Sequence, residues 1–203
     1  NDGVLVDSHA AASAAWAQWS KEFAPDFKWD EPQNAGRRAE DKVRERVAPD
    51  LFEEANNRIN ELEQLSAAET VALGGAVDLL TSLPDNTWTV CTSANPKLGR
   101  ARLTAAGLPI PDQLVTAADV ANGKPNPDPY LLGAERLGFD PADCVVFEDA
   151  QAGALAAIAA GVGLVVGVSE AAMETDADIV VRDLTGITFD GDELYIPDKN
   201  RLR

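Results

Sequence analysis

The chain has 203 residues, enough for one large domain or for a core domain with a smaller one attached. Its 34 acidic and 17 basic side chains give a formal net charge of -17, and such a field repels nucleic acids and anionic membrane surfaces. We therefore expect no nucleic-acid partner and no membrane partner. No apolar stretch approaches the ~20 residues of a membrane span, and we expect no signal peptide.

The two cysteines, Cys91 and Cys144, both lie in apolar runs. This is typical of buried thiols in a reducing compartment, and a disulfide is the minor alternative. The expected location is the cytoplasm. We also expect a monomer.

The chain begins with "NDGVLVDS", in which Asp2 stands next to Gly3 at the apparent end of a first strand. Glycine permits a sharp turn there, and a carboxylate at such a point can donate or accept a proton. Asp7 and Ser8 are interpreted as a helix cap and a hinge.

Residues 9–68 predict helices throughout, because apolar side chains recur at helical spacing and no strand pattern interrupts them. The spacing is clearest at Leu51, Ala55, Ile59 and Leu62. We interpret this region as a small helical cap inserted after the first strand. The expected domains are an α/β core over 1–8 and 69–203 and a helical cap over 9–68.

From residue 71 onward, short apolar runs alternate with helical patterns, which is typical of an α/β domain with helices on both faces of a parallel sheet. Continuous apolar runs of this length favour strands buried on both sides. The expected strands are 87–92, 113–117, 144–148, 163–168 and 177–181. Helices are expected over 96–106 and 152–160. Near the end, "GITFDGDELYI" predicts a hairpin, because "DGD" separates two short apolar runs.

Ligands bind at the carboxyl ends of parallel strands, and two of the expected strands end in reactive side chains. "VFED" places Glu148 and Asp149 together, and adjacent carboxylates favour a hard cation such as Mg²⁺. An aspartate capping the next helix is the alternative. "VCTSANP" places Thr92 and Ser93 before a helix start that Asn95 is expected to cap, and hydroxyls and backbone N–H groups there form an anion site. Residues that simply favour a helix start are the alternative.

The loop "NGKPNPDP" carries Lys124 between stiffening prolines. The reduced freedom of this loop suits a cation held against a phosphate. A solvated surface lysine is the alternative.

These segments occur in the order N-D-G-V-L-V-D-S, V-C-T-S, K-P-N-P-D-P and V-V-F-E-D-A-Q-A-G. Together they resemble the haloacid dehalogenase-like hydrolase superfamily over nearly the whole chain, including the helical insertion. The closest likeness is to its sugar-phosphate and polyol-phosphate phosphatases, in the group of glycerol-3-phosphatase, 2-deoxyglucose-6-phosphatase and β-phosphoglucomutase. The resemblance implies a Rossmann-like core sheet and a phosphoric monoester hydrolase.

The resemblance also implies roles for individual residues. Asp2 matches the general acid and base, and Thr92 with the amide of Ser93 matches the phosphoryl-binding group. Lys124 matches the cation that balances phosphate and nucleophile. Two acids, Glu148 and Asp149, match the Mg²⁺ ligands, together with the nucleophile and the carbonyl of Asp2.

One part of the family pattern, the nucleophilic aspartate, would stand immediately before Asn1. We expect that residue, and the strand leading to it, to precede Asn1 in the complete protein. That strand would be central, so leaving it out would leave its two neighbours with unpaired backbone groups and a slot between them.

The helical cap is expected to close over the site and contribute substrate contacts. In "NAGRRAED" the segment Gly36-Arg37-Arg38 resembles the Gly-Arg segment of related caps, and Arg38 is the expected contact because a guanidinium suits phosphate or hydroxyl oxygens. A solvated face of mixed charges is the alternative.

The leading hypothesis is a Mg²⁺-dependent phosphatase of a small phosphorylated sugar or polyol, acting through an aspartyl phosphate. A sugar-phosphate mutase of the β-phosphoglucomutase type uses the same core and remains an alternative. A non-catalytic phosphate-binding protein is the alternative from another class. A dehalogenase is disfavoured, because that chemistry needs neither the acid pair nor the second aspartate.

Overall fold

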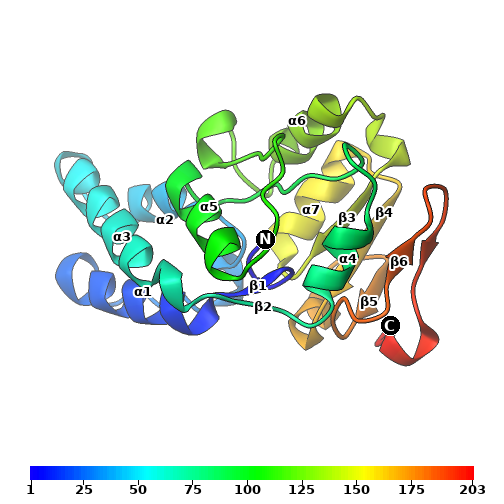
Figure 1. The fold of residues 1–203 in the computed structure, drawn as a ribbon. Helices are drawn as coiled ribbons and strands as arrows, with labels where there is room; N and C mark the ends of the chain where they lie inside the picture. The colour runs from blue at the N-terminus through cyan, green and yellow to red at the C-terminus, as the bar shows by residue number, and fades with distance from the viewer.

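The computed structural model describes residues 1–203 and contains a parallel sheet in the order β3-β4-β5 (Figure 1). These strands are β3 (Val145–Glu148), β4 (Leu164–Val168) and β5 (Ile179–Val181). Each lies in one of the apolar runs that predict strands, so these three predictions are confirmed. The register pairs Val146 with Val165 and Val166 with Ile179.

Helices cover both faces of this sheet, because alternate side chains of β4 enter different apolar clusters. Val166 and Val168 pack with residues of α4 (Ala76–Ser82) and α5 (Pro96–Ala105). Val165 packs with residues of α6 (Asp128–Leu137) and α7 (Gln151–Ala160). The predicted α/β core with a doubly covered parallel sheet is therefore confirmed.

The helical cap consists of α1 (His9–Phe23), α2 (Ala39–Arg44) and α3 (Phe52–Ser66). Its core is an aromatic cluster around Trp16 and Trp19, packed against Ile59 of α3. The indole of Trp19 donates a hydrogen bond of 2.8 Å to the carbonyl of Ala55, so α1 and α3 are joined by a polar contact as well as by apolar packing. As expected, residues 9–68 contain no strand.

The chain enters and leaves the cap through two short strands that lie side by side (Figure 1). β1 (Val6–Asp7) pairs antiparallel with β2 (Val71–Ala72). At the other end of the chain, β6 (Thr188–Phe189) and β7 (Leu194–Tyr195) form the predicted hairpin. Short 3-10 turns occupy Pro32–Asn34, Pro49–Leu51, Ala67–Glu69, Ala117–Asp119, Pro141–Asp143, Glu170–Glu174 and Asp198–Asn200.

Two segments predicted as strands, 87–92 and 113–117, form only one parallel bridge, between Cys91 and Val115. Their backbones are joined by hydrogen bonds of 2.9 Å from the Thr92 N–H to the Val115 carbonyl and from the Val115 N–H to the Val90 carbonyl. The first segment has this partner on one side only. Its other side faces a groove, and this missing pairing explains why a regular strand is not formed.

The groove has a volume of about 680 Å³ and separates residues 87–91 from β3. Apolar side chains line it, including Val90, Phe147 and Leu5. β3 is an edge strand of its sheet, so its backbone is unpaired toward the groove. No helix in the structure combines the length and apolar character that crossing a membrane requires.

Candidate active site

Three of the predicted site segments meet at the carboxyl end of β3. Glu148 is the last residue of that strand, and the ammonium group of Lys124 donates a hydrogen bond to its Oε1 atom. The same ammonium donates to the carbonyl of Cys91, at 3.1 Å, directly before Thr92. Lys124 is only 5% exposed, so the alternative of a solvated surface lysine is not what the structure contains.

Tyr130 is a further member of this group, and the sequence patterns did not identify it. Its hydroxyl donates to Glu148 Oε1, and its ring lies 4.8 Å from the Lys124 ammonium. Burial by itself would raise the pKa of Glu148, but Lys124 foremost, with the amino terminus and the tyrosine hydroxyl, brings it below its ordinary value. Glu148 is therefore a buried carboxylate that already has partners.

Asp149 has the opposite environment. No hydrogen bond to its carboxylate is present, and burial followed by repulsion from Glu148 raises the pKa of Asp149 to about 7. The following helix α7 has no side-chain cap, so Asp149 does not play the helix-cap role considered from the sequence. Gly3 packs against this carboxylate so closely that a Cβ atom at Gly3 would overlap Asp149 Oδ2. Only glycine allows this approach, at a φ of +69°.

Asp2 lies near this site, and its Oδ1 atom is held by two side chains. Ser8 donates a hydrogen bond of 2.5 Å to Asp2 Oδ1, and Arg102 of α5 forms an ion pair with the same oxygen at 3.0 Å. Burial opposes ionisation, but Arg102 and Ser8 help to lower the pKa of Asp2 below its usual value. Ser8 makes no capping hydrogen bond to α1, so its hydroxyl orients Asp2 instead.

Thr92 and Ser93 lie where the chain enters α5. The buried hydroxyl of Thr92 accepts a hydrogen bond of 3.1 Å from the Ala94 N–H. Ser93 donates to the carbonyl of Gly36 in the cap, at 2.7 Å. Asn95 caps α5 through the Leu98 N–H, at 2.9 Å, as expected from the sequence. This turn is thus both a helix start and a contact between the core and the cap.

Arg38 lies at the start of α2 and is already engaged. Its guanidinium forms ion pairs with Asp41 at 2.8 Å and Glu40 at 3.0 Å, and donates to the Val120 carbonyl at 3.3 Å. The chain of Gly123 packs against it, because a Cβ atom there would lie 2.5 Å from Arg38 Nε. In this structure Arg38 connects the cap to the loop that carries Lys124.

A second group of buried charges joins the cap to Asp2. Arg102, besides pairing with Asp2, forms an ion pair of 3.3 Å with Glu63 of α3. Lys42 of α2 is buried close enough to both carboxylates for them to raise its pKa, although burial dominates and lowers it to about 8. The sequence contains one signal for these two buried charges, which is their helical spacing. Glu63 continues the spacing of Ala55 and Ile59, and Arg102 follows Leu98 by one turn, so both charges fall on buried helix faces.

The donor types suit Mg²⁺, which prefers carboxylate and carbonyl oxygens. Asp149 fits best, because its carboxylate is partly buried and has no cation or hydrogen-bond donor as a partner. Glu148 has one oxygen occupied by Lys124 and Tyr130, and its other oxygen accepts from the Asp149 N–H at 3.2 Å. No three His, Cys, Asp or Glu side chains of the chain converge as a metal-binding group. A further ligand is therefore needed beside those present.

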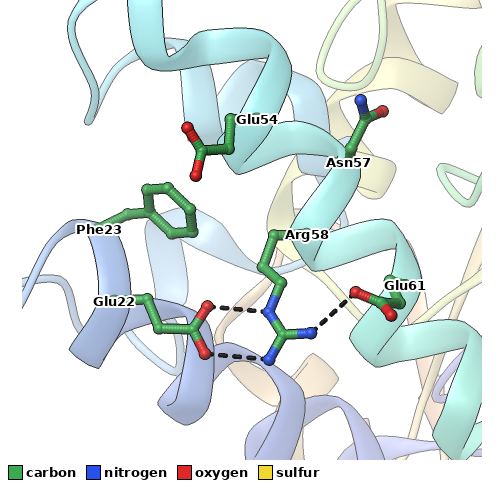
Figure 2. Close-up of a pocket in the computed structure, with 6 residues that line it drawn as sticks. All are labelled: Glu22, Phe23, Glu54, Asn57, Arg58 and Glu61. Carbon is green, nitrogen blue, oxygen red and sulfur yellow. Dashed lines mark hydrogen bonds and ion pairs between the residues drawn. The ribbon is translucent and has the colours of Figure 1, made fainter.

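A separate pocket of about 600 Å³ lies on the cap and contains none of these residues. Figure 2 shows Arg58 of α3 between Glu22 and Glu61, with ion pairs of 2.8 Å to each. Phe23, Glu54 and Asn57 complete its lining. The pocket is open and its one guanidinium is already neutralised, so we do not assign the chemistry to it.

The unpaired Asp149 predicts a pH-dependent stability in the presence of a chelator. The folded protein holds this proton up to about pH 7, whereas an aspartate carboxyl ordinarily has a pKa of 3.8, so the unfolded chain loses the proton earlier. The free energy of unfolding therefore falls as pH rises from about 4 to about 7, by on the order of 4 kcal/mol in total, and this carboxyl lowers it no further at higher pH. We expect a lower melting temperature at about pH 7.5 than at about pH 5.5.

Asp149→Asn should remove most of this pH difference, and Asp112→Asn, at an exposed position, should leave it unchanged. Calorimetry of the three proteins at both pH values checks the prediction. An equal pH response in the Asp149 variant would show that other groups cause it. Added Mg²⁺ should raise the melting temperature of the unmodified protein most at the higher pH, because the carboxylate is then ionised.

The family model of the haloacid dehalogenase-like hydrolases matches residues 1–161. Hexitol phosphatase A of Escherichia coli is 37% identical over 194 residues, which cover 92% of this chain and 90% of that protein. Glycerol-1-phosphate phosphohydrolase 1 of Saccharomyces cerevisiae is 32% identical, over 90% of this chain and 79% of the relative.

Among solved structures, a hydrolase from Pseudomonas syringae superposes with a TM-score of 0.78 and 26% identity, covering 90% of this chain and 91% of that one. Sequence, family model and fold thus agree. The chain therefore belongs to the haloacid dehalogenase-like hydrolase family, and the phosphatases among its relatives confirm the prediction of a phosphoric monoester hydrolase of the sugar and polyol phosphatase group.

Proposed function

We propose that this protein hydrolyses small phosphorylated sugars or polyols with the help of Mg²⁺, through an aspartyl-phosphate intermediate. The observation that carries the proposal is the buried Lys124–Glu148 pair beside the unpaired carboxylate of Asp149. The fixed ammonium of Lys124 can bind a phosphate dianion, and the carboxylate of Asp149, which has no cation beside it, can bind a metal ion. The names of the relatives support the substrate class.

The nucleophile in this proposal is an aspartate immediately before Asn1, at the end of a strand. The apolar groove between residues 87–91 and β3 supports it, because each side presents backbone without a partner toward the other. A parallel strand in the groove would pair with both sides and fill the apolar space. Asn1 lines the same groove, so that strand would lead directly into Asp2.

Each site residue has a role in this reaction. Thr92 and the amide of Ser93 would bind the phosphoryl oxygens, and Lys124 would neutralise charge between phosphate and nucleophile. Asp2 would donate a proton to the leaving oxygen as the aspartyl phosphate forms, and would then accept the proton of the attacking water. Its lowered pKa favours the ionised form that the second step needs. Mg²⁺ would be held by Asp149, the Asp2 carbonyl, the nucleophile and Glu148 Oε2, the oxygen that Lys124 and Tyr130 leave free. The ion would reduce the repulsion between the nucleophile and the phosphate.

We further propose that the cap, over residues 9–68, acts as a lid that excludes water. The contacts from Ser93 to Gly36 and from Arg38 to Val120 support this, because both join the cap to loops of the site. Arg38 would hold the lid against the Lys124 loop and contact substrate only if its ion pairs open. The proposal includes a cytoplasmic monomer, and the free thiols of Cys91 and Cys144 are consistent with a reducing compartment.

The first test is the intact mass of the protein from its natural source, with sequencing of its amino-terminal peptide. We expect a mass above 21.5 kDa and a peptide that contains Asp-Asn-Asp-Gly. A mass of 21.5 kDa would contradict the assigned nucleophile and favour a non-catalytic phosphate-binding protein.

The second test measures phosphate release by that protein from a hexitol phosphate and from glycerol 1-phosphate. We expect turnover with Mg²⁺, loss of turnover with a chelator, and recovery when Mg²⁺ is restored. Replacing the aspartate before Asn1 by asparagine should abolish the reaction, and the 203-residue chain should be equally inactive. Activity that survives chelation would refute the metal, and transfer of the phosphate within a sugar instead of its release would identify a mutase.

A further inference from the structure

Lys42 is a buried cation for which the proposed mechanism has no use. Its side chain rises from α2 of the cap and is only 7% exposed, and its ammonium lies 4.5 Å from the ring centre of Trp16. No hydrogen bond or ion pair of this ammonium is present among the contacts of residues 1–203. A buried ammonium with three donors and no acceptor is costly, unless a ligand supplies oxygen atoms.

The surroundings of Lys42 place it at the boundary between the cap and the reaction site. The charges that influence its pKa are Glu63 of α3, Arg102 of α5, Asp2 and Arg37. Arg102 contacts both Asp2 and Glu63, so these groups form one buried network with Lys42 beside it. Asp2 is the proposed proton-transfer group, and the part of the substrate that leaves with that proton lies on this side of the phosphate.

The charges of this network balance. Lys42 and Arg102 bring two positive charges, and Asp2 and Glu63 bring two negative ones. Burial raises the pKa of Glu63 and so favours its neutral form. Arg102 and Lys42 oppose this shift, so that Glu63 keeps part of its negative charge. The Lys42 ammonium can therefore donate hydrogen bonds to a substrate. The network has no surplus positive charge, however, and binding a second phosphate or a carboxylate of the substrate would require one.

The other cations of the cap add no such surplus. Arg37 is paired with Glu45, and Arg38 is paired with Glu40 and Asp41. The exposed guanidinium groups of Arg44 and Arg46 lie over the rings of Phe52 and Phe27.

We propose that Lys42 is a specificity-determining residue that donates hydrogen bonds to hydroxyl oxygens of an uncharged polyol or sugar group on the phosphate ester. This inference rests on the proposed function and narrows its substrate class. It also separates the protein from a mutase that works on bisphosphates, because the charge of Lys42 is balanced within its network and the cap has no other unpaired buried cation for a second phosphate.

The experiment compares the full protein with two variants, Lys42→Met and Lys21→Met. Methionine is an unbranched side chain that fills most of the space of lysine and removes the ammonium that lies over Trp16. Lys21 is an exposed lysine of α1 that serves as the matched control. Each protein is assayed with a hexitol phosphate and with para-nitrophenyl phosphate, whose leaving group has no hydroxyl except the one formed on cleavage. Circular dichroism and melting temperature verify that both variants are folded.

We expect Lys42→Met to raise KM for the hexitol phosphate roughly tenfold, because a hydrogen bond from a charged donor is lost, with a smaller effect on kcat. KM for para-nitrophenyl phosphate should change less than about twofold, and the control should match the unmodified protein. Equal losses for both esters, or no loss for either, would overturn the inference. Preference of the unmodified protein for a sugar bisphosphate over the monophosphate would also overturn it.

A binding measurement separates this inference from the proposed function. Calorimetric titration with a hexitol phosphonate, which cannot be hydrolysed, reports affinity whether or not the protein has phosphatase activity. Affinity about tenfold weaker in Lys42→Met, without turnover by any protein, would support the Lys42 contact and refute the phosphatase. Turnover with unchanged phosphonate affinity would support the phosphatase and refute the Lys42 contact, and no binding to the unmodified protein would refute the contact as well.

Discussion

Asp2→Asn is expected to lower kcat for a hexitol phosphate by about 10²- to 10⁴-fold, the range typical of lost general acid–base catalysis. Asparagine has the shape of aspartate and offers one oxygen to Ser8 and Arg102, the two partners of Asp2 Oδ1. The variant therefore keeps the local structure and loses the proton-transfer group. Steady-state kinetics on the complete protein, with Mg²⁺ present, measures the effect.

The leaving group provides the control for this prediction. An alkoxide from a polyol needs a proton as it departs, whereas para-nitrophenolate is stable without one. The defect in forming the phosphoenzyme, measured in a single turnover, should therefore be much smaller with para-nitrophenyl phosphate. Ser8→Ala, which removes one hydrogen bond and keeps the carboxylate, should cost far less than Asp2→Asn. Equal defects with both esters would assign Asp2 to positioning.

Lys124→Met is expected to destabilise the protein by about 3 to 5 kcal/mol, because Glu148 then remains as a buried charge without its cation. For a chain of this size, the loss corresponds to a melting temperature lower by roughly 10 °C. Turnover should also be lost, since the same ammonium is proposed to neutralise the phosphate. Urea unfolding and phosphate release measure the two effects separately.

The double variant Lys124→Met with Glu148→Gln distinguishes structure from chemistry. The amide of glutamine carries no charge, and it still offers an oxygen to the Tyr130 hydroxyl. We expect most of the lost stability to return and the activity to remain absent. If the single variant is as stable as the unmodified protein, the buried pair contributes less than its geometry indicates. If the double variant is active, Lys124 has no catalytic role.

Local signals in the sequence predict the helices of the insertion, the helices over 96–106 and 152–160, and three strands. Asn95 and Pro96 predict the start of α5, and the structure contains that cap. The apolar runs of β3, β4 and β5 predict strands because a strand covered on both faces must be apolar throughout. Residues 87–92 have the same pattern, yet they form no regular strand. A segment forms a regular strand only when neighbouring strands pair with its backbone, and those neighbours come from other parts of the chain.

The candidate site was also predictable in part. The position of Glu148 after a strand and the match of Lys124 to the family pattern predict one site, and the structure brings the two side chains into contact. Their third partner, Tyr130, lies on α6 and has no local pattern that marks it. The same holds for Arg102, whose contacts to Asp2 and Glu63 join three distant parts of the chain.

The class of this protein follows from its sequence alone: an α/β core with a helical insertion, and the residue types of a phosphoryl-transfer site at its strand ends. Short-range physics sets these features, because capping, periodicity and the apolar runs of buried strands act within a few residues. Which charged side chains find a partner, in contrast, depends on how distant segments pack together. Packing the cap against the core pairs Arg102 with Glu63 and brings Arg38 to the Val120 carbonyl, and it leaves Lys42 buried without a hydrogen-bond partner. In the core, Asp149 remains partly buried and unpaired. Burial and distance set the cost of a charge, and both arise when distant segments meet.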